Sequence, residues 1–248
     1  MGVGAGLMGL VGLTILGTSF LSGIFGMAGG MILLGVLLAL LDVVPAMVLL
    51  GVTQIGSNGW RFWLWRAHVR GRIVLHCAFG MLAMFVLLKI VAFVPDKVTV
   101  YLGLGLTPFL MELLPGRFRP HVEMRGMPAV CGATIMGVQT FAGVSGSVLD
   151  AFFQSSSLDR KEIVATKAAI QSVGHVLRIV YFGSFAVDAG DVLPPAALVA
   201  AVLLALAGTT LASRVLERMS EVTFRRWSRL LILAIGAVFI ARGLAMAF

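Results

Sequence analysis

Polar and cationic side chains follow one face of two apolar segments, and their types suit the binding of a small anion. In the second half of the chain they recur at positions i, i+4, i+8 and i+11, as Lys167, Gln171, His175 and Arg178. The first half repeats the stripe as Gln54, Asn58 and Arg61, with Leu50 in place of the lysine. These spacings place each set on one side of a helix. Because a lysine or arginine costs about 2.5–3.5 kcal/mol near the bilayer centre, we expect these groups to face a partner or a watery cavity.

Some of these side chains also have a simpler interpretation that needs no ligand. Arg61 and Lys167 lie near the ends of their helices and could extend to the lipid headgroups. His175 could serve as an interhelical hydrogen-bonding residue. Arg178 and Gln171 lie deeper in their segment, so a role in a transport pathway is favoured for them.

Glycine-rich breaks precede both polar segments. We expect extended backbone at Gly26–Gly30 and at Gly143–Ser147, followed by short helices that begin at Met31 and Val148 inside the membrane. Such a helix end has free N–H groups and a partial positive charge, which is a ready anion site. The residues that we expect beside the ligand here are Gly29, Gly30, Ser145, Gly146 and Ser147.

Asp150 is the third residue of the second short helix, and its role has three alternatives. It could favour the helix N-terminus, pair with Lys167 or Arg178, or carry a proton. The ion pair is the favoured interpretation. The intramembrane carboxylate also makes Asp150 the candidate for proton coupling.

The two glycine-rich segments belong to an internal repeat. Gly26–Trp65 aligns without a gap on Gly143–Phe182, at an offset of 117 residues. The polar and glycine identities are Gly26/Gly143, Gly29/Gly146, Asp42/Asp159, Gln54/Gln171 and Arg61/Arg178. Paired interruptions of this kind in an apolar chain indicate the binding site of a transporter.

The composition excludes a soluble domain, since 59% of the 248 residues are hydrophobic and 12% are charged. Apolar stretches near the ~20 residues that cross a bilayer recur along the chain. We predict eight spans, at about 3–25, 44–65, 73–93, 98–114, 128–145, 163–185, 195–212 and 227–247. Shorter apolar pieces lie at 31–41 and 148–157. The fold class is therefore an all-α polytopic membrane protein of about eight full spans and two short helices.

The placement of charge predicts an inverted repeat. Basic loops at 66–72, 117–125 and 214–226, together with Arg160 and Lys161, alternate with acidic or balanced loops, as the positive-inside rule expects. Equivalent loops of the two halves therefore face opposite sides. We divide the chain into a first repeat at 1–117 and a second at 118–248, each with five elements and both termini extracytoplasmic. The alternative to a spanning broken helix is a re-entrant hairpin.

Other classes of protein fit less well. The net charge of +8 is concentrated in loops, so it sets topology and does not indicate nucleic acid. Cys77 and Cys131 lie in apolar segments and are predicted to be buried thiols, with no disulfide or metal site. We expect no cofactor and no enzymatic activity. A sulfur-relay enzyme or subunit that uses the cysteines is the less favoured alternative.

The glycine motifs resemble those of a known family. Gly26-Met-Ala-Gly-Gly30, its echo Gly143-Val-Ser-Gly-Ser147 and the following polar helix are similar to the sulfite exporter TauE/SafE family over essentially the whole chain. The resemblance implies a carrier in the inner membrane for sulfite, sulfoacetate or another organosulfonate, with export the favoured direction. A permease for another small anion or metabolite, and a structural subunit, stay open as alternatives. A homo-oligomer is also open, because glycine-rich faces can pack against a second protomer.

Overall fold

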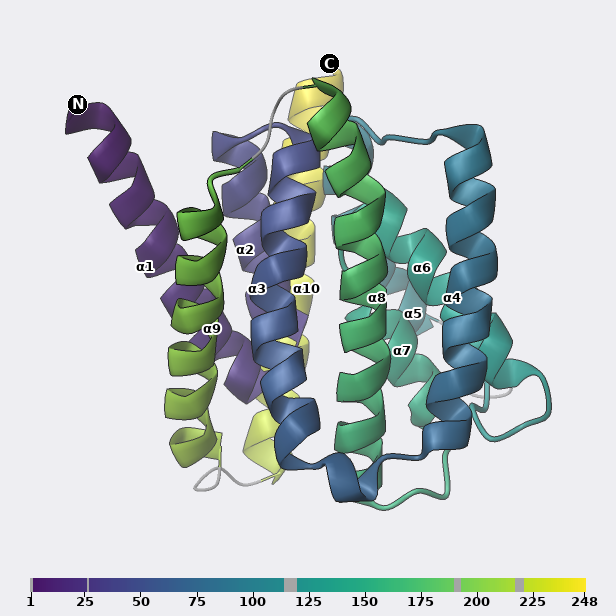
Figure 1. The fold of residues 1–248 in the computed structure, drawn as a ribbon. Coiled ribbons are helices and arrows are strands. Elements are labelled where there is room, and N and C mark those ends of the chain that lie inside the picture. Colours follow the sequence, from purple (N-terminus) through teal and green to yellow (C-terminus); the bar gives the residue numbers. More distant parts are fainter. Residues whose placement is uncertain (1, 26, 114–119, 190–192, 217–220) are drawn as a thin grey trace.

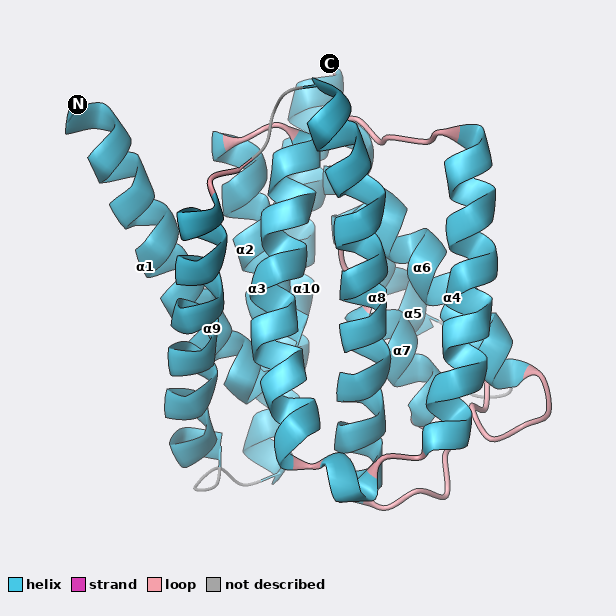
Figure 2. Cartoon of the chain, in the orientation of Figure 1, coloured by secondary structure: helices cyan, strands magenta, loops and turns pink. Residues whose placement is uncertain are grey.

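A computed structural model describes residues 2–25, 27–113, 120–189, 193–216 and 221–248, and within these ranges the chain folds into helices without strands (Figures 1 and 2). The first half holds α1 (Gly2–Phe25), α2 (Met27–Leu40), α3 (Val43–Leu64), the short 3-10 helix η1 (Arg66–His68), α4 (Gly71–Val91) and α5 (Lys97–Leu113). The second half holds α6 (Met127–Ala142), α7 (Gly146–Phe153), α8 (Arg160–Ala189), α9 (Pro195–Leu216) and α10 (Glu221–Ala247). The predicted all-α polytopic class is confirmed.

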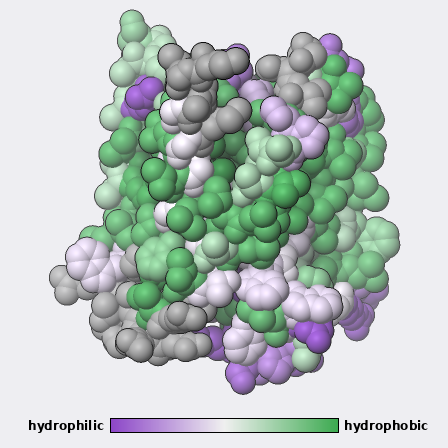
Figure 3. Space-filling view, turned by 60° about the vertical axis from the view of Figure 1, so that its left-hand side comes forward, coloured by the Kyte–Doolittle hydropathy of each residue, from purple (hydrophilic) through white to green (hydrophobic). Residues whose placement is uncertain are grey.

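Apolar length accounts for most of these helices. Four of the described helices are long and apolar enough to cross a membrane, namely Gly71–Val91, Arg160–Asp188, Pro195–Ala212 and Arg229–Ala247. Shorter apolar stretches lie at Gly9–Ile24, Ala28–Leu40 and Met127–Ala142. Large apolar side chains such as Phe79, Ile90 and Leu113 are exposed on the outside. Figure 3 shows such side chains over most of the height of one face, with hydrophilic ones toward its ends. This is the surface that a lipid bilayer covers.

Equivalent helices of the two halves run in opposite directions. In Figure 1, α3 and α5 descend and α4 returns upward, whereas α8 and α10 ascend and α9 descends. The contacts follow the same exchange: α3 packs on α8 and α5 on α10, while α1 packs on α9 as α6 packs on α4. This is the arrangement that an inverted repeat predicts. The proposed boundary at residue 117 lies outside the described residues, so the division into repeats stays a prediction.

The loops that connect the helices lie at two opposite edges of the bundle. Arg70 of the α3–α4 connection forms an ion pair of 2.5 Å with Glu162 at the start of α8, so the basic segments 66–72 and 160–161 share the lower edge in Figure 1. At the opposite edge, Lys97 lies 3.3 Å from Asp42. The parts of the 117–125 and 214–226 loops that hold most of their arginines lie outside the described residues or side chains.

The first glycine-rich segment is helical, which corrects the prediction of extended backbone. Helix α2 begins at Met27 and includes Gly29 and Gly30; Gly26 lies outside the described residues. Helical pairing satisfies backbone groups that the membrane would leave without partners. Gly29 also lets α2 approach α1 closely, because an ideal Cβ there would lie 2.0 Å from the carbonyl oxygen of Thr18.

The second break is present but shorter than predicted, because Gly146 and Ser147 are already helical and α7 begins before the predicted Val148. This break forms the tip of a hairpin. Helix α6 ends at Ala142, Gly143 adopts φ +73°, and α7 starts at Gly146. With 16 and 8 residues, α6 and α7 measure about 24 Å and 12 Å, less than the ~30 Å of hydrocarbon. The base of the hairpin is closed by a hydrogen bond of 3.0 Å from the Val122 N–H to the Phe152 carbonyl. Both ends of the α6–α7 hairpin therefore lie at one edge, which matches the re-entrant alternative in this half.

Candidate functional site

The tip of the α6–α7 hairpin receives the side chain of Arg178 from α8. Arg178 is 1% exposed, and its Nη2 donates hydrogen bonds to the carbonyl oxygens of Gln139 (3.2 Å) and Gly143. Gln139 in turn donates from Nε2 to the Gly174 carbonyl at 2.8 Å. Of the two carbonyls that Arg178 bonds, that of Gln139 lies in the last turn of α6 and that of Gly143 follows the helix, so neither has a partner within α6. Arg178 thus holds the tip of the hairpin against α8.

Some of the hydrogen-bonding atoms of the buried side chains in this region have no partner. The buried side-chain atoms without a hydrogen-bond partner, among the described residues, are Arg178 Nε, Arg178 Nη1, His175 Nδ1 and Ser147 Oγ. Buried polar atoms in proteins nearly always have partners, so each exception requires an explanation. All three side chains belong to the stripe and the break that the sequence singled out. Their unused atoms are the strongest structural indication of a ligand.

The start of α7 adds backbone donors to the same region. Ser145 precedes the helix and is 7% exposed, and the first helical bond runs from the Leu149 N–H to its carbonyl. The N–H groups of the first turn, which includes Gly146 and Ser147, therefore have no partner within the helix. Together with the helix dipole they favour an anion at this end.

Arg61 occupies the equivalent place in the first half. Its Nη2 donates to the Ser22 carbonyl of α1 at 3.4 Å, as Arg178 Nη2 donates to Gln139 of α6. Ser22 and Gln139 lie 117 positions apart, the same offset that separates Arg61 from Arg178. The two guanidinium groups thus contact equivalent carbonyls in opposite halves.

The two arginines do not converge on one ligand position. Arg178 lies against Gly51 of α3, since an ideal Cβ at Gly51 would lie 3.4 Å from Arg178 Cδ. Arg61 comes ten residues later in α3, about 15 Å along the helix. The sequence analysis assigned both arginines to the binding of a small anion. The structure places them at separate levels, and Arg178 is the buried one.

Most of the remaining predicted residues lie in contacts between helices, and Lys167 forms an ion pair. Gln54 and Asn58 are 9% and 5% exposed, and the Gln54 amide rests on Gly30, where an ideal Cβ would lie 2.4 Å from Nε2. Gln171 is half-buried on α8. Gly29 serves the contact of α2 with α1, as described above. For Gly29 and Gly30, close helix packing explains the glycine without a ligand.

Lys167 and Asp150 form an ion pair. The Lys167 Nζ contacts Asp150 Oδ1, and the two side chains are 25% and 56% exposed. This is one of the alternatives given for Asp150 above. The pair gives Lys167 an internal anionic partner, so its charge is balanced within the protein.

Sequence reasoning missed Gln139 and the Gly143 carbonyl as partners of Arg178. Gln139 lies before the aligned repeat segment, and its counterpart Ser22 is a different residue type. The available signal was its position: it is a polar side chain in an apolar helix at the repeat offset from Ser22. The Gly143 carbonyl could not be predicted, because every residue has a backbone carbonyl.

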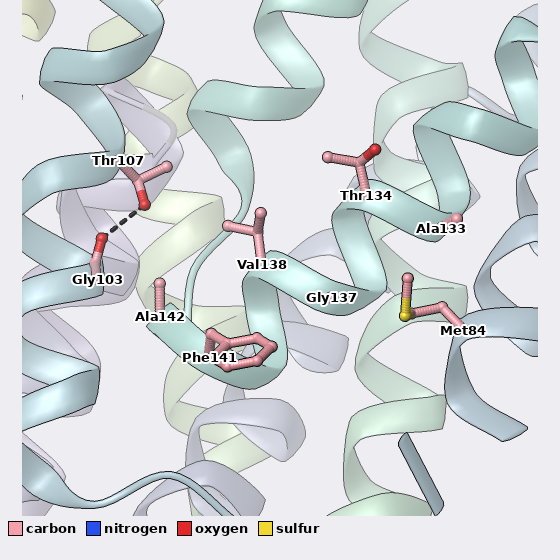
Figure 4. Close-up of a pocket in the computed structure, with 9 residues that line it drawn as sticks. All are labelled: Met84, Gly103, Thr107, Ala133, Thr134, Gly137, Val138, Phe141 and Ala142. Atoms are coloured by element: carbon pink, nitrogen blue, oxygen red, sulfur yellow. Dashed lines mark hydrogen bonds between the residues drawn. The ribbon is translucent and has the colours of Figure 1, made fainter. Parts of the chain in front are cut away.

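Two hollows lie in the described part of the chain, and neither has Arg178, His175 or Ser147 in its lining. One, of about 370 Å³, has an almost wholly apolar lining on α4, α5 and α6, and its Thr107 hydroxyl already bonds the Gly103 carbonyl of its own helix at 2.6 Å (Figure 4). The other, of about 520 Å³, lies among the loops at the lower edge, beside Arg70 and Glu123. Cys77 and Cys131 are buried free thiols, as predicted. The described part of the chain holds no cluster of metal-ligating side chains.

Inverted helical halves with an ionisable side chain buried within the membrane are features typical of membrane transport proteins. The chain is a member of the sulfite exporter TauE/SafE family, whose sequence pattern it matches over residues 3–239. Comparison with curated proteins found no match, and neither did comparison with solved structures. Membership shows a transporter family and supports a multi-pass membrane protein.

Proposed function

We propose that this protein is a secondary transporter that exports a small sulfur-containing anion, such as sulfite, sulfoacetate or another organosulfonate, across the inner membrane. Membership of the family supports the transport class and a substrate that contains sulfur. The observation that carries the proposal is the buried Arg178 guanidinium, which has two nitrogens without partners beside the start of α7. A buried cation with unused donors is destabilised unless an anion completes it.

The proposed site lies between the two halves, within the membrane. Arg178 and His175 come from α8, Ser147 comes from the α6–α7 hairpin, and α3 of the first half packs against α8 at Gly51. An anion held there would contact both halves, so a movement of one half against the other would change its access. Inverted-repeat transporters work in this way. Both termini would face the extracytoplasmic side.

Flux into proteoliposomes tests the proposal. Labelled sulfite and sulfoacetate would be supplied to vesicles that contain the wild-type chain, Arg178→Gln or Arg66→Gln, with folding checked by thermal unfolding. Arg66 is an exposed arginine at the lower edge, so Arg66→Gln is the matched control. We expect saturable flux in the wild type and the control, and a roughly 100-fold loss in Arg178→Gln, because a charge-assisted hydrogen bond in a buried site is worth about 3 kcal/mol.

Three other outcomes would have a clear meaning. Undiminished flux in folded Arg178→Gln would place the site elsewhere. Saturable flux of a different anion alone would support the general permease. Failure of every anion tested, with folded wild-type protein, would favour the structural or sulfur-relay subunit.

A further inference from the structure

We infer that the site at the α6–α7 tip selects a head group with a single negative charge, such as hydrogensulfite or the sulfonate group of an organosulfonate, and rejects a head group with two charges, such as sulfate. This inference rests on the proposed function and specifies the charge of its substrate. It is carried by the balance of charge around Arg178, which the sequence alone did not show.

Arg178 is the unbalanced charge at this site. Within the described residues no carboxylate pairs with it, and its two bonded partners are carbonyl oxygens, which are neutral. The carboxylate carried by α7, Asp150, is bonded to Lys167. That pair contributes no net charge. Arg61, the equivalent cation, bonds α1 about 15 Å further along α3.

The other groups at the tip are polar without a fixed charge. His175 is 7% exposed and Ser147 supplies a hydroxyl, while Gln139 uses its amide on Gly174. The side chains of the site therefore carry one positive charge. In a buried, low-dielectric place, one added negative charge brings the site to neutrality. A head group with two charges would leave a net negative charge there, with a desolvation penalty larger than that of a head group with one charge.

The free donors also match a head group with three oxygens around one sulfur. Two guanidinium nitrogens of Arg178 and the Ser147 hydroxyl are available, and the N–H groups of the first turn of α7 follow a few residues after Gly143, whose carbonyl Arg178 bonds. Each oxygen of such a head group can accept a hydrogen bond from a different donor. Charge decides between anions of this shape, because sulfate offers similar oxygens with twice the charge.

A comparison of how two permanently charged anions bind tests the inference. Methanesulfonate carries one charge and sulfate two at neutral pH, so neither needs a proton from the protein. Binding would be measured on the full chain in detergent, as the rise in thermal unfolding temperature with anion concentration at constant ionic strength. We expect methanesulfonate to half-saturate the effect at a concentration at least about tenfold lower than sulfate does.

A charge variant and its control make the test independent of absolute affinity. His175→Lys adds a positive charge beside Arg178 and should shift the preference toward sulfate by about tenfold or more. His175→Asn, which introduces the residue found at the equivalent Asn58, adds no charge and should keep the preference for methanesulfonate. Folding of each variant is checked by its unfolding transition without anion.

The outcomes separate the inference from the proposed function. Sulfate binding as tightly as methanesulfonate to wild type, or an unchanged ratio in folded His175→Lys, would overturn charge selection and leave an anion site in place. Loss of all effects in Arg178→Gln would tie the binding to this site. If neither anion acts on the wild type and no sulfur-containing anion is transported, the proposed function fails and the inference fails with it.

Discussion

At the scale of single residues, Gly143 is the position whose backbone the hairpin most requires. Its φ of +73° is a left-handed conformation that side chains other than glycine adopt at a cost of about 1–2 kcal/mol. Its carbonyl also accepts a hydrogen bond from Arg178. A Cβ at this residue would lie 2.0 Å from Leu34 Cδ2, and Leu34 is fully buried. Conformation and space therefore both favour glycine here.

Gly143→Ala should lower the free energy of unfolding by about 2–5 kcal/mol, the sum of backbone strain and overpacking. Gly126→Ala is the matched control, because Gly126 also has a positive φ (+84°) but has nothing within 4 Å of an added Cβ. That variant should lose only the strain, about 1–2 kcal/mol. Denaturation in detergent measures both. Equal losses in the two variants would show that Leu34 moves aside without cost.

At the scale of elements, the α6–α7 hairpin is held at its base by Glu123. Its carboxylate accepts hydrogen bonds from the Ser157 N–H and hydroxyl, both at 2.7 Å, so the segment before α6 is tied to the segment after α7. These bonds, the backbone N–H first, lower the pKa of Glu123 below its ordinary value of 4.5. The carboxylate form therefore stabilises the folded hairpin.

The sign of this shift predicts a loss of stability in acid. Because the pKa of Glu123 is lower in the folded state, its contribution is complete above about pH 4.5 and disappears as the pH falls through the folded-state pKa. Glu123→Gln should unfold at a lower temperature than wild type at neutral pH, by a small amount since the group is exposed. The difference should shrink below pH 4.5. A difference that stays constant from pH 7 to pH 3 would contradict this account.

At the scale of the whole molecule, the opposite directions of equivalent helices are the feature with the widest consequence. Ser157 lies before α8 at the edge that holds Arg70 and Glu162, and Val187 lies near the end of α8 at the other edge. Helix α8 has 30 residues and measures about 45 Å, enough to cross the bilayer. The two residues should therefore face different compartments.

Labelling of single cysteines by a membrane-impermeant maleimide checks this. Ser157→Cys and Val187→Cys should react from opposite sides of sealed vesicles, and the native Cys77 and Cys131 should stay unlabelled because both are buried. By the positive-inside rule we expect Ser157→Cys to react from the cytoplasmic side. Labelling of both positions from one side would reject the inverted arrangement.

The sequence by itself determined the class of fold, most helix positions and the residues worth testing. Apolar length fixes where helices can cross a membrane, and the offset of 117 residues identified Arg61 and Arg178 as counterparts. The same reasoning singled out Arg178, His175 and Ser147, whose side chains hold the buried unpaired atoms of the described residues. These features are local or periodic, so they are visible in a chain without coordinates.

Tertiary structure alone decided how these groups are used. It showed helical backbone at Gly29 and Gly30, because close packing of α2 on α1 also calls for glycine and a helix satisfies its own N–H groups. It showed that Arg61 and Arg178 lie at separate levels of the bundle, and that Asp150 forms an ion pair with Lys167. The carbonyls that hold Arg178 are backbone atoms, which every residue has, and the charge left over depends on contacts between distant segments. A sequence lists its charges, and only the fold determines which of them are balanced.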